Sequence, residues 1–194
     1  MANADVAVLG AGFSATAMII NLLEHLPPGK SVAVAGAIGN FGRGTAYSTT
    51  DDGHRLNVSA ARMSLYADRP DHLVEWLGRQ GHAYGPEDFV PRKLYGTYIQ
   101  HSLSQSLQQQ DNRARVSFLG AEAIDCERFD CERQVFSLSD GASIEANHSV
   151  FCLGGTPAGL PIPPHGPIFP SMPGATTGWN GSIRRRRCSC SARA

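Results

Sequence analysis

The first 35 residues alternate between short apolar runs and one longer amphipathic segment. Residues 6–9 (VAVL) and 31–35 (SVAVA) are almost uninterrupted apolar runs, which are typical of parallel strands buried on both faces. Between them, residues 15–26 carry apolar side chains at helical spacing and are followed by a Pro-Pro-Gly sequence that ends a helix. A strand, a helix and a strand in this order predict a βαβ unit, and therefore an α/β fold with a parallel sheet.

Two more helices are expected after a glycine-rich segment at residues 36–52. The first begins near Pro70, and the second begins at Pro91, because proline is favoured at the first helical position. The second helix has apolar side chains at helical spacing, namely Tyr95, Tyr98, Ile99, Leu103 and Leu107.

The period of the pattern falls to two from residue 115 onward. Val116 and Phe118 alternate with polar residues, and a turn sequence at Asp140 and Gly141 follows another such run. We therefore expect an antiparallel β-meander over residues 115–147, which ends in a hairpin. Residues 149–153 (SVFCL) then predict one more buried strand, which leads directly into a Gly-Gly pair.

The strongest chemical motif lies between the first strand and the first helix, where the sequence is GAGFSA. Gly10 permits a tight turn, Gly12 lets the backbone approach a pyrophosphate, and Ala15 keeps the helix close to the sheet. The N-terminus of the helix offers unpaired N–H groups and the positive end of its dipole to phosphates. The alternative interpretation of the motif is a tight turn with a purely structural role.

One residue departs from the usual pattern of such a unit. The second strand is expected to end in an acidic residue that binds the ribose, but Gly36 stands at that position. The sequence alone therefore predicts that the substitution Gly36→Glu would tighten binding of the adenosine half.

A second glycine-rich motif, FGRGTAYS, begins at Phe41. Gly42 and Gly44 flank Arg43, so the backbone can approach a ligand closely and the guanidinium can bind phosphate or carboxylate. The alternative is an ordinary flexible loop.

Composition and charge exclude several other classes of function. Without the five arginines of the last 11 residues, 12 basic residues face 17 acidic ones, which argues against a nucleic-acid-binding surface. The uncharged stretch at residues 6–23 is interrupted by glycines and polar residues, so we expect no membrane segment. The seven histidines form no metal-binding pattern, and the five cysteines fit reduced thiols in a cytoplasmic protein.

Several motifs occur together in one order along the chain, namely GAGFSA, FGRGTAYS, Leu56-Asn57-Val58, Met63-Ser64, the sequence FVPR with Tyr95-Gly96 and Tyr98, and Cys152-Leu153-Gly154-Gly155. Over about residues 5–160 this combination resembles the FAD/NAD(P)-binding family of bacterial flavoproteins. The resemblance implies a Rossmann-like, three-layer FAD/NAD(P)-binding domain of the glutathione-reductase type, with a parallel sheet and an antiparallel β-meander.

The resemblance also implies a set of cofactor-binding residues. The first glycine motif would hold the pyrophosphate, and the second motif and Asn57 would lie along the flavin. The late Gly-Gly pair would return the chain beside the cofactor. The residues so implied are Gly10, Gly12, Phe13, Ser14, Ala15, Gly42, Arg43, Gly44, Thr45, Ala46, Asn57, Gly154 and Gly155.

The expected function is that of an FAD-dependent oxidoreductase or its FAD-binding portion, with NAD(P)H as a candidate reductant. No catalytic acid or base stands out in the sequence, and the substrate is unknown. Two alternatives stay open, namely a non-catalytic nucleotide-binding module and an NAD(P)-dependent dehydrogenase.

The last part of the chain differs in character from the rest. We expect a domain over residues 1–160, partial relative to the family, and a disordered Pro/Gly- and Arg-rich tail over residues 161–194. The resemblance stops near residue 160, no acidic residue follows Glu145, and residues 184–187 are all arginine. These observations favour the hypothesis that the chain from about Ile168 onward is the product of a frameshift, and the alternative is a natural disordered tail.

Overall fold

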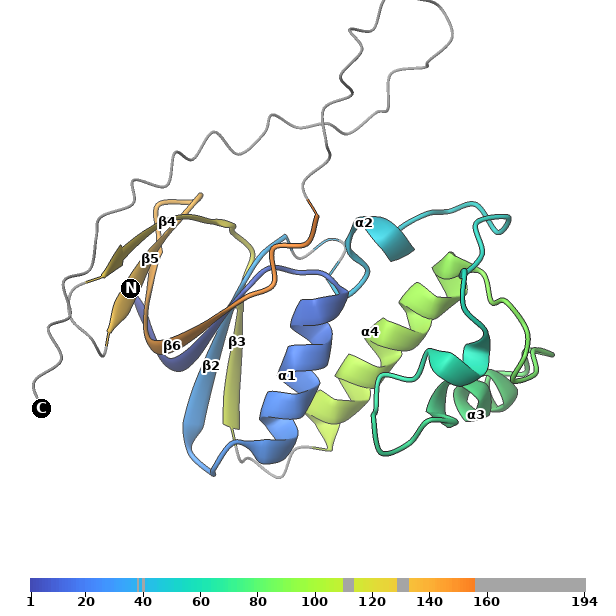
Figure 1. The fold of residues 1–194 in the computed structure, drawn as a ribbon. Helices are drawn as coiled ribbons and strands as arrows, with labels where there is room; N and C mark the ends of the chain where they lie inside the picture. The colour runs from blue at the N-terminus through green and yellow to red at the C-terminus, as the bar shows by residue number, and fades with distance from the viewer. Residues whose placement is uncertain (38, 40, 110–113, 129–132, 156–194) are drawn as a thin grey trace, which may run out of the picture. The chain divides into compact units, whose positions relative to one another are not determined.

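The expected βαβ unit is present at the N-terminus of the computed structural model, and its strands are longer than the apolar runs (Figure 1). Strand β1 spans Ala2–Leu9, helix α1 spans Phe13–His25 and strand β2 spans Lys30–Ala35. β1 and β2 are parallel. The polar start of β1 is tied to β2 because the Asp5 carboxylate accepts from the Ser31 backbone N–H at 2.8 Å and from Lys30 Nζ at 2.8 Å. These interactions lower the pKa of Asp5 to about 2, with the Lys30 hydrogen bond as the largest cause.

The structure describes residues 1–37, 39, 41–109, 114–128 and 133–155. By its internal contacts the chain divides into two units, Met1–Thr156 and Pro157–Ala194. Everything below concerns the first unit. The expectations of a disordered tail and of a shifted reading frame from about Ile168 fall outside the described residues.

The sheet is mixed, with the strand order β3-β2-β1-β6-β5-β4. The first four of these strands are parallel, with β3 at Ala114–Leu119 and β6 at Ser143–Phe151. β5 at Gln134–Leu138 and β4 at Ala123–Arg128 extend the sheet in the antiparallel sense. The predicted fold class, with a parallel sheet and an antiparallel meander, is confirmed.

Two of the predicted strand assignments need correction. The segment around Val116 and Phe118 is not part of the meander, because β3 lies at the opposite edge of the sheet and runs parallel to β2. The segments 143–146 and 149–153, expected as a hairpin strand and a separate buried strand, are joined in one strand, β6, which ends at Phe151. Phe151 and Leu153 are exposed, so the expectation of a buried strand is wrong for this segment. Alternation of side chains shows that a segment is a strand, but it does not say which strand will pair with it.

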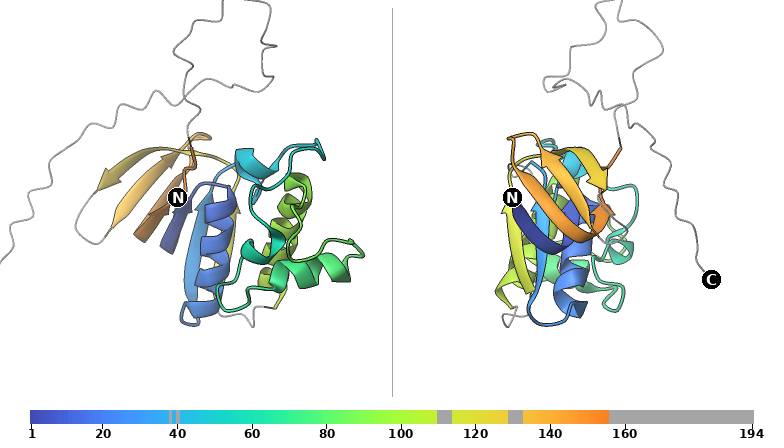
Figure 2. Two further views of the ribbon diagram at one scale, coloured as in Figure 1. Left: turned by 45° about the vertical axis from the view of Figure 1, so that its right-hand side comes forward. Right: turned by 90° about the vertical axis from the view of Figure 1, so that its left-hand side faces the viewer.

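Helices cover one face of the parallel strands, as Figure 2 shows for α1 and for α4, which spans Arg92–Gln108. Helix α3, His72–Arg79, packs with them in the same core, which includes Val8, Val34, Trp76 and Ile99. A second core lies on the other face of β1 and β2, where Leu9 and Ala35 pack with Phe136 of β5 and Ile144 of β6. The meander thus supplies apolar cover for the face that carries no helix.

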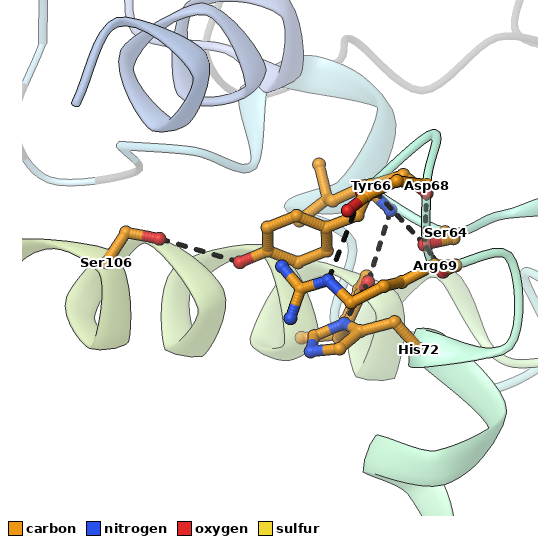
Figure 3. A network of polar contacts seen from close by, with 8 residues as sticks. Ser64, Tyr66, Asp68, Arg69, His72 and Ser106 are labelled. Atoms are coloured by element: carbon orange, nitrogen blue, oxygen red, sulfur yellow. Dashed lines mark hydrogen bonds and ion pairs between the residues drawn. The ribbon is translucent and has the colours of Figure 1, made fainter. Parts of the chain in front are cut away.

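A polar network holds α3 and α4 together beside a short helix, η2, at Ala60–Arg62 (Figure 3). The Ser64 hydroxyl donates to the Arg69 carbonyl at 2.7 Å, and the Arg69 guanidinium lies 3.8 Å from the Tyr66 ring centroid. The Tyr98 hydroxyl accepts from the Leu65 N–H at 3.1 Å and lies 2.8 Å from Nδ1 of the buried His72.

No helix within the described ranges is long and apolar enough to cross a membrane.

Candidate functional site

The carboxyl ends of β1, β2 and β6 meet at one edge of the parallel sheet. The chain passes from β1 through α1 to β2, which lies on one side of β1, and β6 lies on the other side of β1. Such a reversal of strand order opens a crevice beyond the carboxyl ends of the strands, and ligands of open α/β sheets bind there. The GAGFSA sequence, called here the glycine turn (residues 10–15), lies at this switch point because it directly follows β1.

Gly10 is required by the close approach of β6 as well as by the turn itself. Its φ is +130°, and a Cβ there would lie 2.1 Å from the Cys152 carbonyl oxygen. The Cys152 N–H donates to the Leu9 carbonyl at 2.7 Å, and the Gly10 N–H donates to the Ala35 carbonyl at 2.8 Å. A side chain at position 10 would therefore push β6 away from β1 at the switch point.

The N-terminus of α1 has no cap from a side chain and no acidic residue in its first turn. Gly12 is the N-cap residue, and a Cβ there would meet no atom closer than Gly44 Cα, at 3.8 Å. The N–H groups of Phe13, Ser14 and Ala15 have no acceptor within the helix, because the first turn of an α-helix leaves its donors unpaired. The positive end of the helix dipole adds to the attraction of this point for an anion.

The second motif folds against the first, and the segment from Phe41 to Tyr47 is called here the arginine loop (residues 41–47). The Gly42 N–H donates to the Ala11 carbonyl at 2.8 Å, and a Cβ on Gly44 would lie 3.3 Å from Gly12 Cα. Gly42 and Gly44 both have positive φ, at +87° and +54°. The loop ends in a four-residue helix, α2, at Gly44–Tyr47, where the sequence predicted only a loop. The two glycine motifs therefore lie against each other.

The arginine loop is fastened to α4 by side chains. Arg43 Nε donates to Gln100 Oε1 at 3.0 Å, and Gln100 Nε2 donates to the Phe41 carbonyl at 2.9 Å. One turn earlier on α4, Gly96 leaves room for the loop, because a Cβ there would lie 2.6 Å from the Tyr47 carbonyl oxygen. Sequence reasoning missed Gln100, and only its spacing of four residues from Gly96 could have placed both on one helical face.

An aromatic cluster completes the contact between α1, α2 and α4. The rings of Tyr47 and Tyr95 lie 4.8 Å apart, and Phe13 lies 6.0 Å from Tyr47 and 6.2 Å from Tyr95, measured between ring centroids. Burial raises the pKa of the Tyr47 hydroxyl. Phe13, predicted as a cofactor-binding residue, therefore packs its ring into this cluster, so that only its backbone lies on the glycine turn.

The other predicted residues lie in four settings. Ala15 is fully buried beneath the helix, whereas Ser14, Thr45 and Ala46 are exposed. Gly154 and Gly155 follow Cys152 and lie beyond the end of β6, and a Cβ on either would meet no atom within 4 Å. Asn57 is exposed. The N–H of the preceding residue, Leu56, donates to the Val90 carbonyl at 2.9 Å, so Asn57 lies on a segment that is held by residues 90–91.

Position 36 does not have the space that the sequence-based prediction assumed. A Cβ on Gly36 would lie 2.7 Å from Ala11 Cβ, 2.9 Å from the Gly10 carbonyl carbon and 3.0 Å from the Ala11 nitrogen. Two of these three atoms belong to the backbone of the glycine turn, which cannot move without loss of the turn. The space that the expected tightening by Gly36→Glu requires is therefore absent, and Gly36 is needed for packing against this turn.

Taken together, these residues fit the pyrophosphate of a dinucleotide. The uncapped N-terminus of α1 supplies N–H donors, Gly12 has no side chain at that point, and Arg43 brings a positive charge in the adjoining loop. A dinucleotide phosphate needs this combination of close backbone approach and donors without a competing acidic side chain.

The chain belongs to the FAD-NAD(P)-binding family, whose model matches residues 7–156. The cofactor class predicted from the sequence is confirmed by this membership. No match was found among the curated proteins.

Several solved structures share the fold. A steroid monooxygenase bound to NADP is 22% identical with a TM-score of 0.55, and the similarity covers 80% of this chain and 28% of that chain. A variant of a flavin monooxygenase from Stenotrophomonas maltophilia is 19% identical with a TM-score of 0.51, covering 78% and 38%. The bacillithiol disulfide reductase of Staphylococcus aureus is 11% identical with a TM-score of 0.52, covering 79% and 39%. The present chain thus corresponds to well under half of each of these proteins.

Proposed function

We propose that this chain is the FAD-binding portion of a flavin-dependent oxidoreductase, in which the glycine turn holds the pyrophosphate of FAD. The observation that carries the proposal is the uncapped N-terminus of α1, which begins at a residue without a side chain, Gly12, at the switch point of the sheet. Family membership supports a dinucleotide of the FAD or NAD(P) type as the ligand.

Each group of predicted residues has a proposed part in this site. The backbone N–H groups of residues 13–15 donate to the phosphates, and Gly10 and Gly12 keep side chains out of their space. The arginine loop with Asn57 lines the path of the flavin, and Gly154 and Gly155 pass the cofactor where the chain leaves β6.

The flavin, when bound, supplies the redox chemistry through its isoalloxazine ring, and the protein supplies binding, orientation and electrostatics. We propose NAD(P)H as the reductant, which agrees with the two nucleotides of the family's description. The substrate-binding part and the catalytic acid or base are not identified among the described residues.

Titration with three ligands tests the proposal. The 194-residue protein is titrated with FAD and with riboflavin, which carries the same isoalloxazine without a pyrophosphate, and quenching of flavin fluorescence is followed. ADP is then added as a competitor. We expect FAD to bind about 100-fold or more tightly than riboflavin, because charge-assisted hydrogen bonds to phosphate supply about 1.5–3 kcal/mol each, and we expect ADP to displace it. Equal affinity for riboflavin and FAD, or an ADP that displaces nothing, would contradict the assignment of the glycine turn.

A further inference from the structure

We propose that Gln100 is a positioning residue for dinucleotide binding, and this inference rests on the proposed function. Gln100 lies on α4 and does not belong to either glycine motif. Its amide joins two points of the arginine loop, since it accepts from Arg43 Nε at 3.0 Å and donates to the Phe41 carbonyl at 2.9 Å.

These two hydrogen bonds set the position of Gly44. Residues 41 and 43 lie on either side of Gly42, whose N–H is bonded to the Ala11 carbonyl of the glycine turn at 2.8 Å. With residues 41, 42 and 43 all held, the next residue, Gly44, is brought against Gly12, and its Cβ position lies 3.3 Å from Gly12 Cα. Gln100 therefore fixes one wall of the space into which the first turn of α1 points its N–H groups.

The same arrangement preserves the charge of Arg43. Its Nε bonds to a neutral amide, and Arg43 makes no ion pair with another residue in the described part of the chain. A guanidinium fixed by an amide keeps its whole positive charge, whereas a carboxylate partner would neutralise it. An anionic ligand at the adjoining turn gains from a positive charge that is already oriented.

A glutamine is suited to this role because one side chain must both accept and donate. Leucine at position 100 would remove both bonds, and glutamate would keep the acceptor for Arg43 but lose the donor to Phe41. Glutamate would also neutralise Arg43. If Gln100 only filled space, Gln100→Leu would have a mild effect, because leucine has a similar volume.

The variants Gln100→Leu, Gln100→Glu and Arg43→Met are made in the 194-residue protein, together with the double variant that combines Gln100→Leu with Arg43→Met. Gln105→Leu is the matched control, because Gln105 is an exposed glutamine of the same helix. FAD affinity is measured by quenching of flavin fluorescence, and the free energy of unfolding of the FAD-free protein is measured in parallel.

We expect Gln100→Leu to weaken FAD binding about tenfold, while Gln105→Leu leaves it unchanged. When Arg43→Met is already present, adding Gln100→Leu should weaken FAD binding by less than about a further threefold, because the two residues act as one unit. Gln100→Glu should weaken FAD binding more than riboflavin binding, since the loss of the bond to Phe41 affects both ligands but only the phosphates sense the charge of Arg43. If the wild-type protein binds FAD and Gln100→Leu binds it equally well, the positioning role is wrong. Fully additive effects of the two substitutions would also overturn it. If the wild-type protein does not bind FAD, the proposed function itself fails.

Discussion

Gly44 contacts Gly12 across the candidate site, and a Cβ added to Gly44 would lie 3.3 Å from Gly12 Cα. The two residues are 32 positions apart in the sequence, and their contact joins the glycine turn to the arginine loop. A Cβ on Gly44 would make a tight contact, whereas a Cβ on Gly12 would meet Gly44 Cα at an ordinary 3.8 Å, so this contact depends on glycine at position 44.

The first prediction concerns Gly44→Ala. Gly44 has a φ of +54°, and Gly81 has a φ of +77° but open space at its Cβ position. Gly81→Ala is therefore a control with a similar backbone penalty and no contact. We expect both variants to lower the free energy of unfolding by about 1–2 kcal/mol, and only Gly44→Ala to weaken FAD binding. Denaturant unfolding and FAD titration measure the two effects, and equal FAD affinity in the two variants would refute the role of the contact.

The second prediction concerns Gly36. Because a Cβ at this position would lie 2.9 Å from the Gly10 carbonyl carbon, the conflict begins at the first side-chain atom. We expect Gly36→Ala and Gly36→Glu alike to lower the free energy of unfolding by about 1–3 kcal/mol and to weaken FAD binding. Denaturant unfolding and FAD titration of both variants check this. Tighter FAD binding by Gly36→Glu than by the wild-type protein would show that position 36 has room for a side chain.

The third prediction concerns pH and His72. Burial is the main cause that lowers the pKa of His72 from its ordinary value of 6.5, followed by the nearby Arg69. The unfolded chain therefore takes up the proton first as the pH falls, which favours unfolding. We expect the contribution of His72 to the free energy of unfolding to be fully present above pH 6.5 and to be lost as the pH falls below 6.5. The slope from this residue is at most about 1.4 kcal/mol per pH unit.

Thermal unfolding between about pH 5 and pH 8 measures this dependence in the wild-type protein and two variants. A glutamine at position 72 can accept a hydrogen bond from the Tyr98 hydroxyl, which lies 2.8 Å from His72 Nδ1, but it does not titrate. His72→Gln should therefore flatten the profile below pH 6.5. His148→Gln, which alters an exposed histidine of β6, is the control and should keep the wild-type profile. If the stability of His72→Gln falls as steeply below pH 6.5 as that of the wild-type protein, another group causes the pH dependence.

The parts of the fold that depend on local patterns could be predicted from the sequence. The βαβ unit follows from two apolar runs around a helical segment, and α4 follows from Pro91 and the spacing of Tyr95, Tyr98 and Ile99. The position of β3 could not be predicted, because Val116 and Phe118 would alternate in the same way in a parallel or an antiparallel strand.

The site was only partly predictable for a similar reason. The glycine turn has its own local signature, but the bond between Arg43 and Gln100 joins residues 57 positions apart, and no local pattern encodes it. In the sequence Gly36 stands where an acidic residue is expected, and nothing there indicates that Ala11 lies against it. Contacts between segments decide such positions, and they follow from packing rather than from spacing.

The most direct test of the central claim is the affinity of Gly12→Val for FAD. Gly12 has extended backbone angles that valine adopts readily, and a Cβ would contact only Gly44 Cα, at 3.8 Å, so the fold should be retained. Gly78→Val, at an exposed position of α3 with open space, is the control. The free energy of unfolding of Gly12→Val is first confirmed to be within about 1 kcal/mol of the wild-type value. We then expect this variant to bind FAD at least about 100-fold more weakly, because the valine methyl groups occupy the place of the pyrophosphate. Gly78→Val should bind FAD as the wild-type protein does. A folded Gly12→Val protein with wild-type affinity for FAD would contradict the account.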